Sequence, residues 1–129
     1  MPELNLWAVV VAAIASFVAA FAYYALFGRQ LAEFGGAAGE QPPTWLVPAI
    51  EVAKGLVIAL VVAWLATIGD LAGWTDGLVL GLGLWVAFPV MLLIGSVVHE
   101  NVAWRLAALH AGDWLVKLLL IAIIVAAWR

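Results

Sequence analysis

Five ionisable residues stand inside stretches that are otherwise apolar, and they are the residues of this chain best placed to do chemistry. Glu51 and Lys54 lie three residues apart in one stretch, and His110, Asp113 and Lys117 follow at intervals of three and four in another. At about 100° per residue, the latter three lie within about 60° of each other on one helix face. Carboxylates and a histidine are the usual parts of intramembrane proton relays.

Four apolar runs have to position these side chains. They cover approximately residues 4–27, 47–68, 78–98 and 106–128. Each has the roughly 20 residues that a helix needs to cross a hydrocarbon core of about 30 Å. Backbone polar groups must be satisfied internally in lipid, so each run is expected to be helical. The sequence therefore predicts an all-α fold, a single transmembrane domain over residues 1–129 built as a bundle of four helices.

The composition agrees with this class and excludes several others. Hydrophobic residues make up 68% of the chain and charged residues 10%, against about 25% charged in soluble domains. The net charge of −3 and the absence of a basic patch argue against a nucleic-acid partner. With no cysteine, thiolate zinc sites and iron–sulfur clusters are excluded. His99-Glu100 does not complete a zinc-protease motif, because Ala103 stands where the second histidine is needed. We expect no metal and no cofactor.

The depth of the ionisable residues predicts that they form one cluster. Residues 47–68 and 106–128 both begin on the side of the membrane opposite the termini. Counting inward, Glu51 and His110 lie about one turn deep, Lys54 and Asp113 about two turns, and Lys117 about three. If these two helices pack together, the two carboxylates and two lysines form a charge-balanced cluster with His110 at its mouth.

Two interpretations of this cluster remain open. In the first, Glu51–Lys54 and Asp113–Lys117 are pairs within their own helices that help the helices associate. The protein is then a small assembly or accessory membrane protein, the interpretation that we prefer. In the alternative, the cluster serves a minimal ion or proton-linked channel or transporter, and Pro89, in the middle of its run, is a hinge. A lipid-modifying enzyme is a third class, but no nucleophile–base pair is recognisable, so we assign no catalytic residue and expect no enzyme.

Small and aromatic residues predict how the helices associate and where they meet the membrane surface. Ala12, Ser16 and Ala20, together with Gly77 and Gly81, have the spacing of helix-packing faces, which predicts a homo-oligomer or association with other membrane proteins in the lipid bilayer. The tyrosines at 23 and 24 are expected at the membrane interface.

The arginines outside the spans give the orientation. Arg29 and Arg105 flank the spans on the side opposite the termini, against Arg129 alone on the terminal side. The positive-inside rule then favours both termini outside, by a single residue.

Three stretches resemble a known family. They are Tyr23-Tyr24-Ala25-Leu26-Phe27-Gly28-Arg29, Trp85-Val86-Ala87-Phe88-Pro89 and Leu109-His110-Ala111-Gly112-Asp113-Trp114-Leu115. Together they resemble a family of small bacterial membrane proteins known as domain of unknown function 1761. His110 stands where that family more often has asparagine, and Asp113 where an aromatic residue is common. The resemblance implies four spans in a bacterial cell (inner) membrane and an uncharacterised activity. Small multidrug exporters also have four helices, but their essential glutamate in the first helix has no counterpart in residues 4–27.

Overall fold

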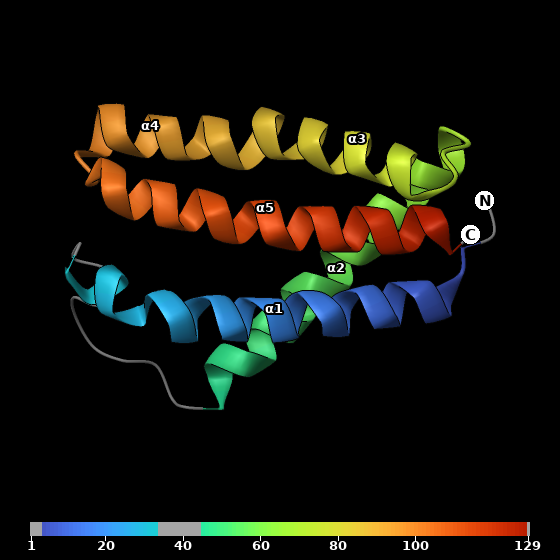
Figure 1. Ribbon diagram of the computed structural model, residues 1–129, viewed down its shortest axis with the longest axis horizontal. Helices are drawn as coiled ribbons and strands as arrows, with labels where there is room; N and C mark the ends of the chain where they lie inside the picture. The colour runs from blue at the N-terminus through green and yellow to red at the C-terminus, as the bar shows by residue number, and fades with distance from the viewer. Residues whose placement is uncertain (1–3, 34–44, 129) are drawn as a thin grey trace.

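The computed structural model describes residues 4–33 and 45–128, which are almost entirely helical (Figure 1). In chain order its elements are α1 (Leu6–Glu33), α2 (Leu46–Ile68), α3 (Trp74–Trp85), the π-helical turn η1 (Val86–Val90), α4 (Met91–Glu100) and α5 (Trp104–Ala127). The elements α3, η1 and α4 follow one another without a break and form one rod. The described part of the chain thus has four helices long and apolar enough to cross a membrane, which confirms the predicted fold class.

The central helix of the bundle is α5, which packs against α1, α2 and the α3–η1–α4 rod. Figure 1 shows α1, α5 and the rod running side by side, whereas α2 crosses them obliquely. The Asn5 amide donates a hydrogen bond to the Trp128 carbonyl at 2.7 Å, and the Gly73 N–H donates to the Ala126 carbonyl at 3.1 Å. The start of α1, the end of α5 and the α2–α3 connection therefore meet at one end of the molecule.

Small residues allow the closest helix contacts, and these contacts lie within the single chain. A β-carbon on Gly77 would lie 2.6 Å from the Ala122 carbonyl oxygen, and one on Gly81 would lie 3.1 Å from the Leu118 carbonyl oxygen. The small residues on the inner face of α1 are buried as well: Ala8, Ala12, Ala13, Ser16 and Ala20. The two faces that the sequence suggested for oligomerisation are thus occupied by other helices of the same chain.

Two helix ends differ from the predicted ones by four residues or more, and the others by no more than two. Helix α1 continues past Gly28 to Glu33, because the residues that follow this glycine favour helix. Helix α3 begins at Trp74, four residues before the predicted start at 78. Gly73 supplies the turn with a φ of +88°, and the Asp76 carboxylate accepts a hydrogen bond from the Ala72 N–H at 3.0 Å.

Pro89 lies inside a helical rod that remains continuous. Proline has no N–H to donate and its ring crowds the preceding turn, and here the helix widens into the π-helical turn Val86–Val90 around it. The proline itself is buried. This turn explains how the span accommodates Pro89, while its use as a hinge stays a prediction.

Candidate functional site

Three ion pairs form a cluster between α2 and α5, and two of them involve the Lys117 ammonium. Its Nζ lies 2.8 Å from Asp113 Oδ2 on the same helix and 3.4 Å from Glu51 Oε2 on α2. Glu51 in turn holds Lys54, with 3.0 Å between Oε1 and Nζ. The structure thus combines the two pairs expected within helices with one pair between helices, and the four side chains form a single cluster.

Helix α1 adds a member to this cluster that the sequence did not indicate. The Tyr24 hydroxyl donates a hydrogen bond to Asp113 Oδ2 at 3.0 Å and lies 3.2 Å from His110 Nδ1. Tyr24 is therefore not simply a membrane-interface residue, because its hydroxyl bridges the histidine and the carboxylate. This contact brings His110 into the network, and three helices now contribute to one polar site.

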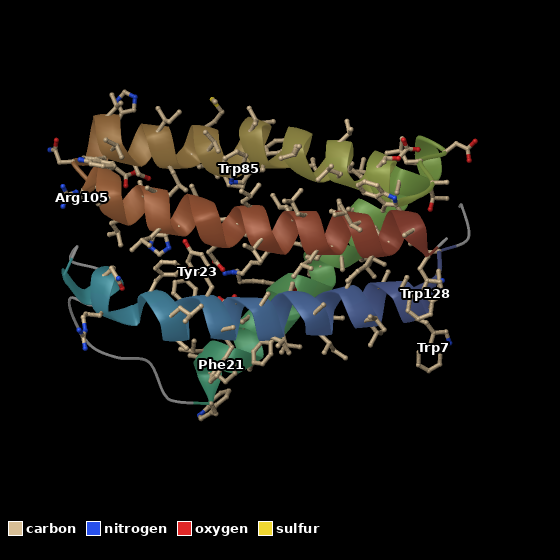
Figure 2. The ribbon with its side chains drawn as sticks, in the orientation of Figure 1. Trp7, Phe21, Tyr23, Trp85, Arg105 and Trp128 are labelled. Carbon is tan, nitrogen blue, oxygen red and sulfur yellow. The ribbon has the colours of Figure 1, made fainter. Side chains whose placement is uncertain are left out.

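The neighbouring Tyr23 fixes the packing of α1 against α5. Its hydroxyl donates a hydrogen bond to the Leu109 carbonyl oxygen at 2.5 Å. Figure 2 shows the Tyr23 side chain between α1 and α5. A β-carbon on Gly112 would lie 2.5 Å from the Tyr23 hydroxyl oxygen, so glycine leaves the space that the phenol fills. Tyr23 thus packs between α1 and α5, while its predicted depth at the membrane interface stays a prediction.

Two tryptophans frame the site. The Trp114 ring has Lys117 Nζ 5.1 Å and Lys54 Nζ 5.8 Å from its centroid, distances at which a cation is attracted to an indole face. The Trp85 indole N–H donates to the Ala111 carbonyl at 2.8 Å, which attaches the rod to α5 beside the site (Figure 2). The site is thus braced by α3 as well as by α1 and α2.

Burial falls steadily across the cluster. The exposed fraction of the side chain is 3% for Asp113, 10% for Lys117, 29% for Glu51 and 46% for Lys54. The cavity between Ser16, Glu51, Lys54, Trp114 and Lys117 has a volume of about 10 Å³, roughly the space of one water molecule. The deep end of the cluster is therefore closely packed, while the end on α2 is open to the surroundings of the bundle.

Asp113 is the least satisfied member of the cluster. Its Oδ2 accepts from Tyr24 and pairs with Lys117, but its buried Oδ1 has no hydrogen-bond partner among the residues that the structure describes. Among those same residues, no group of three or more His, Cys, Asp or Glu side chains is placed to hold a metal ion. The contacts that the structure shows within the cluster are ion pairs and hydrogen bonds.

Together, the four apolar helices and the buried polar cluster define a small helical membrane protein. A family model for a protein of unknown function, DUF1761, matches residues 7–126, nearly the whole chain. The chain belongs to this family, as the three stretches at 23–29, 85–89 and 109–115 suggested. Comparisons with curated proteins and with solved structures gave no match.

Proposed function

We propose that the protein is a small assembly or accessory membrane protein, without enzymatic activity of its own, whose polar cluster locks three helices in register. The observation that carries this proposal is the position of Lys117, whose ammonium is buried and paired with a carboxylate from each of two helices. A buried charge that keeps its partners in one geometry specifies which helix faces meet, a role best known from polar residues at helix interfaces.

The packing around the cluster supports a structural role. The pairs Lys117–Asp113, Lys117–Glu51 and Lys54–Glu51 balance two positive against two negative charges. The adjoining cavity has space for about one water molecule, which leaves little room for a passing ion. Such a cluster adds hydrogen bonds and charge pairs between helices that otherwise attract one another only by close packing in lipid.

The test is whether the chain works as a component of a larger assembly in its own membrane. Native membranes are extracted in a mild detergent, and the size of the complex is measured for wild type and for the double variant Asp113→Asn, Lys117→Met. We expect wild type to migrate well above a single chain, together with other membrane proteins. We also expect the double variant to retain this association, because removing both partners leaves no unpaired charge. Recovery of wild type only as isolated chains would contradict the proposal.

A second candidate is a proton-linked channel or transporter, and one observation favours it. Six side chains form an unbroken series of polar contacts in the order His110, Tyr24, Asp113, Lys117, Glu51 and Lys54. Every member of this series can bind and release a proton. The series begins near the start of α5 and reaches the open end of the cluster on α2.

Proton flux into proteoliposomes tests this second candidate with a matched pair of variants. Tyr24→Phe breaks the series at its hydroxyl, whereas Tyr23→Phe removes an adjacent hydroxyl that donates to the Leu109 backbone carbonyl and is not a member of the series. If the protein conducts protons, we expect flux to be lost in Tyr24→Phe and in Asp113→Asn but retained in Tyr23→Phe. Wild-type flux equal to that of empty liposomes would reject the candidate.

A further inference from the structure

One face of α2 carries a regular row of exposed residues along its whole length. Starting at Val47, the positions advance alternately by three and four residues, and each residue on them is exposed. We call this row the α2 stripe, and it consists of Val47, Ile50, Lys54, Val57, Val61, Trp64 and Ile68. An alternation of three and four is the spacing at which two helices pack with their side chains interleaved.

Lys54 is the one charged member of the α2 stripe, and it is the reason to expect a partner there. Its side chain is 46% exposed although it lies within a membrane-spanning helix. A charged group inside a span normally faces the bundle interior or pairs with another group, because lipid does not solvate it. Glu51 lies one turn before Lys54 and is itself 29% exposed, so positive and negative charge lie together at the edge of the stripe.

This arrangement of charges is complementary to itself. In a two-fold dimer the same patch on each copy faces the other copy. A contact from one residue of the first copy to another residue of the second copy is therefore repeated in the opposite direction. A patch with one positive and one negative group satisfies this rule, since each ammonium can then reach the carboxylate of the other copy. A polar residue at a single position of such a row also fixes the register in which two helices pair.

The outer face of α1 has exposed residues at the same spacing, among them Val11, Ile14 and Val18, but these are apolar. The small-residue face of α1 is buried, and Gly77 and Gly81 are in contact with α5. Between Val79 and Val98 the exposed residues of the rod, such as Leu92, are apolar, as expected for side chains that face lipid. The Glu51–Lys54 ion pair, by contrast, is partly exposed on α2 within its span.

We propose that the α2 stripe is the interface between two copies of this chain, related by a two-fold axis that brings Lys54 of each copy to Glu51 of the other. This inference rests on the proposed assembly role, and it names a second copy of the chain as the first partner in that assembly. It transfers the predicted homo-oligomer interface from the small-residue faces to α2. Pairing across the axis gives each partly exposed lysine a second carboxylate in place of lipid.

The absence of cysteine makes the interface directly measurable, because any single cysteine introduced is unique in the chain. Single variants Val47→Cys, Ile50→Cys, Val57→Cys and Val61→Cys are purified, reconstituted into liposomes and oxidised with copper phenanthroline. Val79→Cys and Leu92→Cys, on exposed positions of the rod, are the matched controls. We expect disulfide-linked dimers for the α2 variants and not for the controls. Equal cross-linking at all six positions, or cross-linking at the controls alone, would overturn the inference.

Charge variants at position 54 then test the pairing itself. In the Val57→Cys background, Lys54→Glu places four carboxylates at the axis, and we expect the dimer yield to fall by about tenfold or more, because facing like charges strongly oppose association. Lys54→Met removes the repulsion and is expected to give an intermediate yield. An unchanged yield in Lys54→Glu would show that Lys54 does not contact the other copy.

The two proposals fail in different ways. Purified protein contains only copies of this chain, so cross-linking in liposomes reports on the α2 interface alone. If the α2 variants form no dimer in liposomes while wild type in native membranes still belongs to a large complex, the two-fold interface is wrong and the assembly role stands. If dimers form but native membranes yield nothing larger, the interface stands and association with other proteins is wrong.

Discussion

The hydroxyl of Tyr23 occupies the space that a side chain on Gly112 would need. A β-carbon at position 112 would lie 2.5 Å from the hydroxyl oxygen, yet 3.4 Å from the ring carbon that bears it, an ordinary contact distance. The conflict therefore comes from one oxygen atom, which also donates a hydrogen bond to the Leu109 carbonyl. This contact sets the distance between α1 and α5 beside the polar cluster.

The first prediction uses that single atom. Gly112→Ala is expected to destabilise the fold by about 1–3 kcal/mol, because the phenol must move out of a packed interface. In a Tyr23→Phe background the same substitution should cost much less, because the conflicting oxygen is gone. The measurement is the free energy of unfolding in mixed micelles for all four combinations. Gly95→Ala is the control, since a β-carbon there meets nothing within 4 Å. Strictly additive effects would show that Tyr23 and Gly112 are not in contact.

The second prediction concerns the closest backbone contact in the bundle. A β-carbon on Gly77 would lie 2.6 Å from the Ala122 carbonyl oxygen and 2.7 Å from the Ile123 α-carbon. Backbone atoms of a packed helix cannot turn aside as a side chain can, so Gly77→Ala should force α3 away from α5. We expect a loss of about 3 kcal/mol or failure to fold, compared with little change for Gly83→Ala, where the space is open. The measurement is the thermal unfolding of the two variants in the same detergent, and equal unfolding temperatures would contradict the prediction.

The sequence predicted the parts of the cluster that depend on local spacing. Glu51–Lys54 and Asp113–Lys117 follow from intervals of three and four residues, which any helix brings to one face. The contact between Lys117 and Glu51 depended further on α2 packing against α5. The position of both polar stripes in one half of the membrane suggested this packing, and the structure contains it. Four apolar runs were equally sufficient to predict four helices, because hydrophobic length alone decides that a segment can span.

The contribution of α1 could not be predicted in the same way. Tyr23 and Tyr24 stand at the end of an apolar run, where tyrosines commonly meet the membrane surface, and nothing in their local sequence distinguishes a surface ring from a packed one. Whether the two rings pack against another helix depends on which face of α1 meets α5, and this is a property of the assembled bundle. The signal in the sequence was indirect: Gly112 lies beside Asp113 on α5, where a missing side chain leaves space for a phenol.

The third prediction concerns the ion pair between Asp113 and Lys117, and it compares the loss of one partner with the loss of both. Lys117→Met leaves Asp113 buried without its cation, and Asp113→Asn removes the closer of the two carboxylates that balance Lys117. Removing one partner of a buried pair typically costs about 3–5 kcal/mol, whereas removing both is often neutral. The double variant should therefore be more stable than the sum of the single losses implies. The unfolding free energies of wild type, both single variants and the double variant form the cycle that measures this, and additivity would mean that the pair contributes nothing.

The fourth prediction concerns the proton on His110. The phenol of Tyr24 has one proton and donates it to Asp113 Oδ2, so its oxygen is free to accept from His110 Nδ1. A hydrogen bond on one ring nitrogen sets the tautomer of a neutral imidazole, so His110 should carry its proton on Nδ1. In Tyr24→Phe this constraint is lost, and the fraction of the Nδ1–H form should fall. Nitrogen NMR of histidine-labelled protein in micelles distinguishes the two tautomers, with His99, exposed at the end of α4, as the internal reference. A His110 spectrum identical in wild type and Tyr24→Phe would mean that the hydroxyl does not bridge the histidine to the carboxylate.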